Sequence, residues 1–185
     1  MESVNTAKIY TVLEVNNLIR ESLKDTFPET IWVCGEIQDL RRREHINFTL
    51  CQKHPTDDSV IARVKVVIFE NTVSYIEKRL KLADSRLILK KDIEVKLLCR
   101  VDFYPKSGQV SLVVFDIDPI YTLGRIAQSR QRIIERLKTK GLLERNKALQ
   151  LPDVPLKIGL ITSVDSAAYH DFVSELKNSG FGFKI

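Results

Sequence analysis

Between residues 29 and 120 the sequence alternates short β-rich runs with turn residues, and one helical segment interrupts them. The runs are IWVCGEIQDL, NFTLCQK, VIARVKVVIF, IEVKLLCRVDFY and QVSLVVFDIDPI. Their β-branched and aromatic content predicts five strands. The helical segment is Glu70–Ala83, which carries apolar residues at helical spacing and lies between the third and fourth runs. Pro105–Gly108 predicts a tight hairpin between the last two.

Five strands in this order, with a helix between the third and fourth, are typical of a small Greek-key barrel, the OB-fold. We therefore predict a mainly β domain with helices over residues 29–120. An α+β sheet of another topology is the alternative, because strand order alone does not fix the pairing of strands.

The segment before the barrel reads as a helix. TVLEVNNLIRESLKDTF, Thr11–Phe27, has apolar residues at helical spacing, and Pro28 ends it. Thr11 is placed to cap the helix, and Glu14 follows three residues later, as in a capping box. Residues 1–28 are thus expected to form an N-terminal helical segment.

The segment after the barrel changes character twice. Gly124–Leu143 has isoleucines and leucines at helical spacing with Gly141 as a stop, which predicts a connecting helix and linker over residues 121–156. KIGLITS then reads as a strand, SAAYHDFVSELKNSG as a helix and GFKI as a second strand. A lone β-α unit cannot cover a parallel sheet, so residues 157–185 are expected to begin a truncated α/β domain.

Composition is that of a globular chain, with 44% hydrophobic and 29% charged residues. The sequence lacks an apolar run of about 18 residues and a secretion signal, so we expect a cytoplasmic protein that does not enter the membrane. Cys34, Cys51 and Cys99 lie in apolar runs and are expected to be reduced core thiols.

Basic residues form clusters, which indicates a polyanionic partner although the net charge is only +5. An OB barrel binds single-stranded nucleic acid with aromatic rings and basic side chains on one sheet face. The predicted DNA-binding residues are Arg41, Arg42, Arg43, His45, Phe48, Arg63, Lys65, Phe103, Tyr104 and Lys106. The alternative is an ordinary solvated strand face, with Phe48 and Phe103 in the core.

The KIGLITSVDSAAYHDF stretch resembles a phosphate-binding turn at the start of a helix. The backbone N–H groups near Thr162, Ser163, Ser166 and Ala167 are predicted to bind a phosphate, because a helix N-terminus favours an anion. Asp171, on the helix, is the candidate catalytic group. A helix cap with a surface aspartate is the alternative. Neither HxxxH nor CxxC spacing occurs, so no metal site is predicted.

These segments together resemble the exodeoxyribonuclease VII large-subunit family over nearly the whole chain. YTVLEVNNLIRESLKDTFP and IWVCGEIQDLRR are similar to its first helix and strand, VDFYPKSGQVSLVVFDIDP to its later strands, and KIGLITSVDSAAYHDF to its catalytic signature. The resemblance implies an OB-fold that binds single-stranded DNA, a catalytic domain, and a helical region that binds a small subunit. It also implies hydrolysis of single-stranded DNA from both ends to short oligonucleotides. The metal requirement varies among members, and Mg is the candidate cofactor of the full-length enzyme.

Within that signature, Thr162, Ser163, Ala167, Ala168 and Asp171 match the family's pattern. The chain departs from it at three positions, Val164, Ser166 and His170, where proline is common, glycine is general and arginine is common in the family. The family's other catalytic groups are expected beyond Ile185, so the parent protein is expected to be an enzyme and this piece inactive. Two alternatives to a nuclease are a non-catalytic single-stranded DNA-binding module and a protein-interaction adaptor.

Overall fold

The structure is a computed structural model, and it describes residues 8–150, 158–163 and 166–181. The chain divides into two compact units, Met1–Arg136 and Leu137–Ile185.

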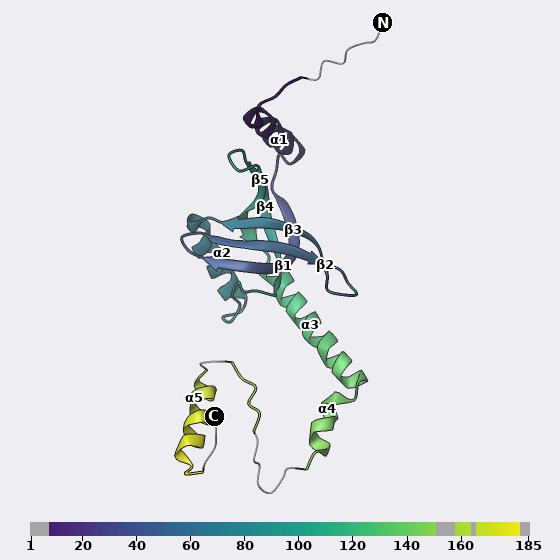
Figure 1. The fold of residues 1–185 in the computed structure, drawn as a ribbon, viewed down its shortest axis with the longest axis vertical. Coiled ribbons are helices and arrows are strands. Elements are labelled where there is room, and N and C mark those ends of the chain that lie inside the picture. The colour runs from purple at the N-terminus through teal and green to yellow at the C-terminus, as the bar shows by residue number, and fades with distance from the viewer. Residues whose placement is uncertain (1–7, 151–157, 164–165, 182–185) are drawn as a thin grey trace. The chain divides into compact units, whose positions relative to one another are not determined.

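The first unit is built on a closed barrel (Figure 1). Its strands are β1 (Ile31–Arg42), β2 (Ile46–Lys53), β3 (Val60–Ile68), β4 (Glu94–Tyr104) and β5 (Gln109–Ile117). They pair in the order β1-β2-β3-β5-β4, antiparallel except for the parallel pair β3–β5. Helix α2 (Glu70–Ala83) connects β3 to β4. The predicted OB-fold is confirmed, and the boundaries predicted for this helix match the structure.

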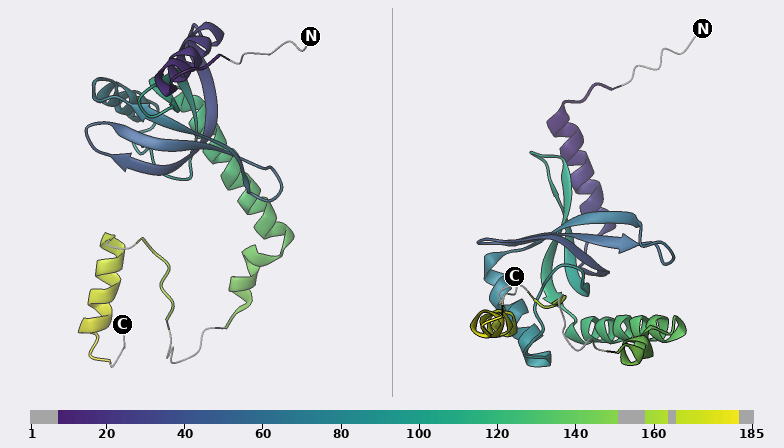
Figure 2. Two further views of the ribbon diagram at one scale, coloured as in Figure 1. Left: turned by 45° about the horizontal axis from the view of Figure 1, so that its top comes forward. Right: turned by 60° about the horizontal axis from the view of Figure 1, so that its bottom comes forward.

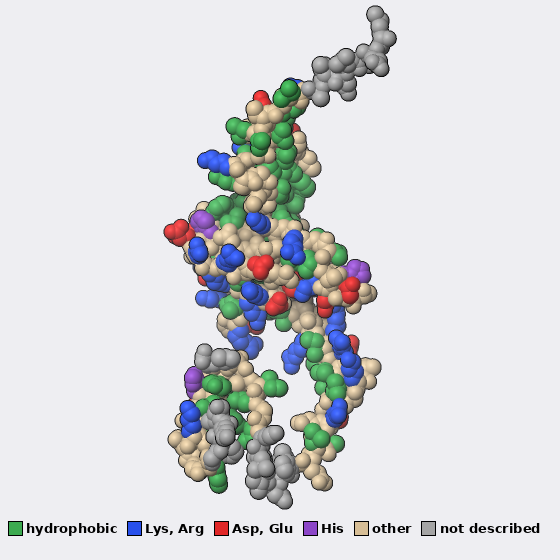
Figure 3. Space-filling view, in the orientation of Figure 1, with side chains coloured by type: hydrophobic (Ala, Val, Ile, Leu, Met, Phe, Trp, Pro, Cys, Tyr) green, Lys and Arg blue, Asp and Glu red, His purple; other side chains and the backbone are tan. Residues whose placement is uncertain are grey.

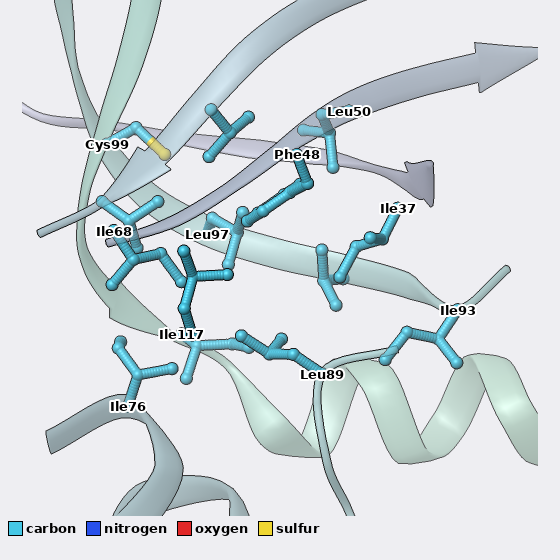
Figure 4. Close-up of a cluster of buried hydrophobic side chains, with 14 of the residues drawn as sticks. Ile37, Phe48, Leu50, Ile68, Ile76, Leu89, Ile93, Leu97, Cys99 and Ile117 are labelled. Atoms are coloured by element: carbon cyan, nitrogen blue, oxygen red, sulfur yellow. The ribbon is translucent and has the colours of Figure 1, made fainter. Parts of the chain in front are cut away.

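Alternate residues of each strand fill the barrel interior. In β2, Ile46, Phe48 and Leu50 are buried, and in β4, Val95 and Leu97 are fully buried. These side chains form one cluster with Ile37 of β1 and Ile76 of α2. Figure 4 shows Phe48, Leu50 and Leu97 in this cluster. Because strand side chains alternate between faces, filling the interior with every second residue turns the remaining residues outward.

The barrel strands cross one another steeply, and helix α1 (Val12–Thr26) lies beside the β4–β5 hairpin (Figure 2). Asn16 fixes this position by donating from Nδ2 to the Pro105 carbonyl oxygen at 2.7 Å. The predicted capping box is present: the Thr11 N–H donates to Glu14 at 2.7 Å, and the Glu14 N–H donates to Thr11 Oγ1 at 3.3 Å. The backbone bond from Thr11 lowers the pKa of the Glu14 carboxyl.

Helix α3 (Pro119–Thr139) begins at Pro119 and not at Gly124 as predicted. The Asp118 carboxylate accepts a hydrogen bond from the Tyr121 N–H at 3.1 Å, and proline is favourable as the first helical residue. That backbone bond lowers the pKa of the Asp118 carboxyl. Glu94 of β4 then accepts from the Tyr121 hydroxyl at 2.6 Å and from Arg125 Nε at 2.7 Å, which fixes the first turns of α3 against the barrel.

The second unit contains α4 (Leu142–Arg145), the short helix η1 (Asn146–Ala148) and α5 (Ala167–Asn178). The predicted stops hold, since Gly141 and Gly180 have φ of 65° and 74° in the left-handed region. Residues 158–163 form no strand, contrary to the prediction for KIGLITS. A strand requires a hydrogen-bonded neighbour, and the described part of this unit offers none. The predicted strand GFKI lies outside the described residues.

Among the described residues, no helix is long and apolar enough to span a membrane. The three cysteines are free thiols, and Cys51 and Cys99 are buried as predicted. Cys34 is exposed, contrary to the prediction, because its position in β1 turns it to the outside. Burial raises the pKa of the Cys99 thiol to about 12, and burial also raises that of Cys51.

Cysteine reactivity tests this burial. A thiol-specific reagent at pH 8 is expected to modify Cys34 rapidly in the folded protein, because it is the exposed thiol. Cys51 and Cys99 should react slowly, because burial blocks access and disfavours the thiolate. Peptide mapping after a short pulse checks the pattern, and equal labelling of all three in the folded and denatured protein would contradict it.

Substitution at Ile37 tests the barrel core. Ile37→Ala is expected to lower the free energy of unfolding by about 2–5 kcal/mol, because it empties a fully buried site. Ile61→Ala is the matched control, since Ile61 is a strand residue with 54% exposure, and should cost about 1 kcal/mol or less. Urea denaturation measures both, and equal losses would contradict the assigned core.

Candidate nucleic-acid interface

The outer side of β1, β2 and β3 carries a row of polar residues set by strand register. Thr49 of β2 pairs with Gln38 of β1 on one side and with Lys65 of β3 on the other. Its neighbours Phe48 and Leu50 point into the barrel, so Thr49 and its pairing partners point outward. Arg63 lies two residues before Lys65 on the same side, and both are exposed.

A bulge in β1 brings Arg41 onto this outer side. Gln38 pairs with Thr49, and Arg41 pairs with Asn47, so β1 has one more residue than β2 between these pairs. Asp39, in the bulge, has φ of 53°, a left-handed conformation that aspartate tolerates better than most residues. If residues 38–41 alternated regularly, without a bulge, Arg41 would point inward, because Gln38 points outward.

Tyr104 joins the same surface through β5. Tyr104 pairs with Gln109, whose Oε1 accepts a hydrogen bond from Lys65 Nζ at 2.8 Å. Directly paired residues share a side of the sheet, so the exposed Tyr104 ring lies on the side of Lys65. We call Arg41, Arg63, Lys65 and Tyr104 the basic face. Figure 3 shows Lys and Arg side chains spread over the barrel on the side where β1–β3 lie in front.

The other two arginines of the predicted run have different environments. Arg42 is bound within the protein, with NH1 donating to Glu77 of α2 at 2.6 Å and NH2 to the Leu89 carbonyl oxygen at 3.0 Å. It therefore holds α2 and the loop after it against β1. Arg43 is exposed in the β1–β2 turn, where its N–H donates to the His45 carbonyl oxygen at 3.1 Å.

His45 has a structural contact that the sequence did not indicate. Its Nδ1 accepts a hydrogen bond from the Glu70 N–H, the first residue of α2, at 3.2 Å. Its ring meets that of Phe69 edge to face with centroids 5.1 Å apart. His45 thus satisfies a free N–H at the start of α2, whose N-cap residue Phe69 has no side-chain acceptor.

The prediction that two aromatic residues bind DNA is wrong. Phe48 is 4% exposed and Phe103 is 6% exposed, and Phe48 belongs to the core cluster. Both occupy strand positions whose parity points inward, so neither ring is open to a base. The alternative interpretation, core packing, is correct for both.

Polar residues that sequence analysis missed complete the surface. Gln38, Asn47, Thr49 and Gln109 lie between the basic residues, and the alternation of polar and apolar letters in β2 is the signal that could have identified two of them. Lys106 is exposed in the β4–β5 turn, where Gly108 has φ of 65°. This turn extends the surface beyond Tyr104.

The predicted phosphate site lies in the second unit, at the start of α5. Ser166 is the N-cap, and its Oγ accepts from the Tyr169 N–H at 3.2 Å and lies 3.3 Å from Thr162 Oγ1. The Ser166 N–H donates to the Ser163 carbonyl oxygen at 3.2 Å. The structure therefore brings these three residues together, with Ala167 as the first helical residue. Ser166 has φ of −73°, which any residue adopts, so serine is unstrained at this position.

Asp171 is exposed on the second turn of α5. In the described part of the chain, no group of three His, Cys, Asp or Glu side chains comes together that could hold a metal ion. The described residues thus do not form a magnesium site by themselves, and Asp171 would be a single ligand there.

A groove of about 1040 Å³ in the first unit runs between β1, β2 and α3. Two ion pairs occupy its walls, Lys53–Glu36 at 2.5 Å and Arg125–Glu94 at 2.6 Å. Bonding to Glu36 raises the pKa of Lys53. Lys90, Lys91, Arg130 and Arg132 line the same groove, so it carries further cations besides these two ion pairs.

Comparison with known proteins agrees with this geometry. Residues 10–118 match a family described as OB-fold nucleic acid binding domain, which is more than half of the chain. A solved structure of the N-terminal domain of PriB protein from Thermoanaerobacter tencongensis covers 49% of this chain and 94% of its own, with 12% identity and a TM-score of 0.35. That score is too low to bear on fold or function.

Two relatives extend the similarity past the barrel. The protein named exodeoxyribonuclease 7 large subunit from Thioalkalivibrio sulfidiphilus (strain HL-EbGR7) is 29% identical over 177 residues, which cover 95% of this chain and 36% of the relative. A protein of the same name from Nitrosomonas europaea (strain ATCC 19718) is 30% identical over 171 residues, 91% of this chain and 34% of the relative. The resemblance found from the sequence motifs is confirmed, and the chain spans about a third of these relatives' length.

Proposed function

Because the chain belongs to the family of OB-fold nucleic acid binding domains, we propose that it binds single-stranded DNA through the basic face. The observation that carries this proposal is the register of β1, β2, β3 and β5. It gathers Arg41, Arg63, Lys65 and Tyr104 on one outer side of the barrel.

The chemistry of the basic face fits a single strand better than a duplex. Exposed cations attract the phosphates, and Tyr104 offers a ring on which an unpaired base can stack, an interaction of about 1–3 kcal/mol. The amides of Gln38, Asn47 and Gln109 can donate to and accept from bases without requiring one sequence. A protein-interaction adaptor is the second candidate, and it would not need cations in this row.

For the whole protein we propose the activity named for its relatives, that of an exodeoxyribonuclease VII large subunit. The barrel would hold single-stranded DNA while a nuclease domain hydrolyses it from both ends to short oligonucleotides. The small subunit would bind a region outside this chain. Such an enzyme works on cellular DNA, so we place it in the cytoplasm. The described residues alone are expected to be inactive.

At the start of α5, the N–H groups near Thr162, Ser163, Ser166 and Ala167 would hold a phosphate of the strand. Asp171, one turn further, would orient the attacking water and accept its proton. Both roles rest on the sequence signature and on the cap geometry around Ser166. The described residues do not supply a ligand set for a magnesium ion.

Salt dependence tests the basic face. The double variant Arg63→Ala/Lys65→Ala is expected to weaken binding of oligo-dT. It should also reduce the slope of log affinity against log salt by about 1.4, because two phosphate contacts are lost at about 0.7 each. Fluorescence anisotropy with a labelled oligonucleotide measures both quantities.

The matched control is Lys81→Ala/Arg86→Ala, which removes the same charges from exposed positions outside the basic face. Its salt slope should equal that of the wild type. Equal slope reductions in both double variants would mean that net charge, and not this face, binds DNA. A flat salt response in the wild type would favour the adaptor.

The substitution Asp171→Asn tests the proposed catalytic role. In the full-length protein with its small subunit, Asp171→Asn is expected to reduce hydrolysis of labelled single-stranded DNA by about 100-fold or more, because the carboxylate that accepts the proton is lost. DNA affinity should be unchanged. Glu175→Gln, an exposed carboxylate one turn further on α5, is the control and should retain activity. Unchanged turnover in Asp171→Asn refutes the role.

A further inference from the structure

Three exposed aromatic rings of the barrel and helix α2 each lie beside a cation. Lys96 Nζ is 5.0 Å from the Trp32 ring centroid, Arg100 Cζ is 5.4 Å from that of Phe115, and Arg79 Cζ is 5.9 Å from that of Tyr75. The exposed fractions of the three aromatic residues are 46%, 41% and 46%. The function proposed above uses none of these rings.

Strand register places these rings on one side of the barrel, away from the interior. Trp32 of β1 pairs with Leu98 of β4, which pairs with Asp116 of β5. Lys96 and Arg100 flank Leu98 at alternate positions and share its side. Phe115 is the extra residue of a bulge in β5, which turns it outward over Arg100.

Tyr75 reaches the same side from helix α2. Its hydroxyl accepts from Arg79 NH1 at 3.1 Å, and that same nitrogen donates to Asp116 of β5 at 3.2 Å. A chain of contacts therefore joins the edge of α2 to the outer side of β4 and β5. We call Trp32, Phe115 and Tyr75, with their three cations, the aromatic face.

The charges of the aromatic face differ from those of the basic face. Asp118 binds Lys96 and Asp116 binds Arg79, each at 3.2 Å. Arg100 makes no ion pair with a carboxylate within the described residues. Two of the three cations are thus largely neutralised. The aromatic face therefore suits stacking with the rings of bases better than attraction of phosphates.

The two faces are continuous through shared strands. β1 carries Trp32 near its start and Arg41 near its end, and β5 carries Phe115 and also Ser111, which pairs with Lys65. Single-stranded DNA that leaves the basic face along β1 or β5 reaches the aromatic face. An OB barrel contacts about 4–16 nucleotides, which is enough to pass from one face to the other.

We propose that single-stranded DNA continues from the basic face onto the aromatic face, where its bases stack on Trp32 and Phe115. This inference rests on the proposed DNA binding and adds a second site to it. Every base has a π-face, so stacking there is independent of sequence. A base that covers a ring displaces the flexible side chain of Lys96 or Arg100 from that ring.

Trp32 is the chain's only tryptophan, so its fluorescence reports this site directly. Titration of the full chain with oligo-dT of about 16 nucleotides is expected to quench the tryptophan emission with the midpoint seen by anisotropy. Trp32→Leu and Phe115→Leu should each weaken binding by about 5-fold or more, because each loses one stacked base. The salt slope should remain that of the wild type, because no phosphate contact is removed.

Tyr10→Ala is the matched control, since Tyr10 is 44% exposed beside Lys8, at 4.8 Å, and lies outside the barrel. Its affinity should equal that of the wild type. Trp32→Phe keeps a ring and should recover most of the affinity lost in Trp32→Leu. Circular dichroism and urea denaturation verify that each variant is folded.

The outcomes separate this inference from the proposed function. If Trp32→Leu and Phe115→Leu bind like the wild type while Arg63→Ala/Lys65→Ala binds weakly, DNA is confined to the basic face and this inference is overturned. If the wild type itself does not bind oligo-dT, the proposed function fails as well. A lower sedimentation coefficient of Trp32→Leu without DNA would assign the aromatic face to contact between copies, which also overturns it.

Discussion

Closure of the barrel by the parallel pairing of β3 with β5 is the constraint on which the rest of this structure depends. Lys65, Val66 and Val67 pair with Ser111, Leu112 and Val113, and this contact leaves every strand with two neighbours. The closed interior accepts apolar side chains alone. Each strand must then turn its charged residues outward, and the same register decides which charged residues become neighbours.

The proposed DNA-binding surface follows from this separation of buried apolar residues from outward charged ones. Lys65 lies between Thr49 of β2 and Ser111 of β5 because the barrel is closed, and through Gln109 it meets the side of the sheet that carries Tyr104. The bulge at Asp39 adjusts β1 so that Arg41 faces the same way. On the other side, the bulge at Phe115 exposes a ring beside Arg100. Two one-residue irregularities thus determine which side chains are available to a ligand.

The sequence predicted the elements better than the surface. The strands, α2 and the capping box of α1 follow from periodicity and composition, which depend on local residues. The orientations of Phe48, Phe103 and Arg41 depend on parity and on bulges, and a bulge at Asp39 has no clear sequence signal. Arg42 was predicted to bind DNA but contacts Glu77, 35 residues away, a partner that only the fold brings close. The apolar run in KIGLITS is typical of a strand. The described part of its unit provides no second strand to pair with it, so residues 158–163 form none.

We propose that barrel closure creates a surface for single-stranded DNA on the outer side of β1, β2 and β3. Amide chemical shifts of the isotope-labelled chain, recorded while oligo-dT is added, test it most directly. We expect the largest shifts on Asn47–Cys51 and on residues 63–65, in adjacent strands. Shifts confined to α2, or no shifts at low ionic strength, would contradict it.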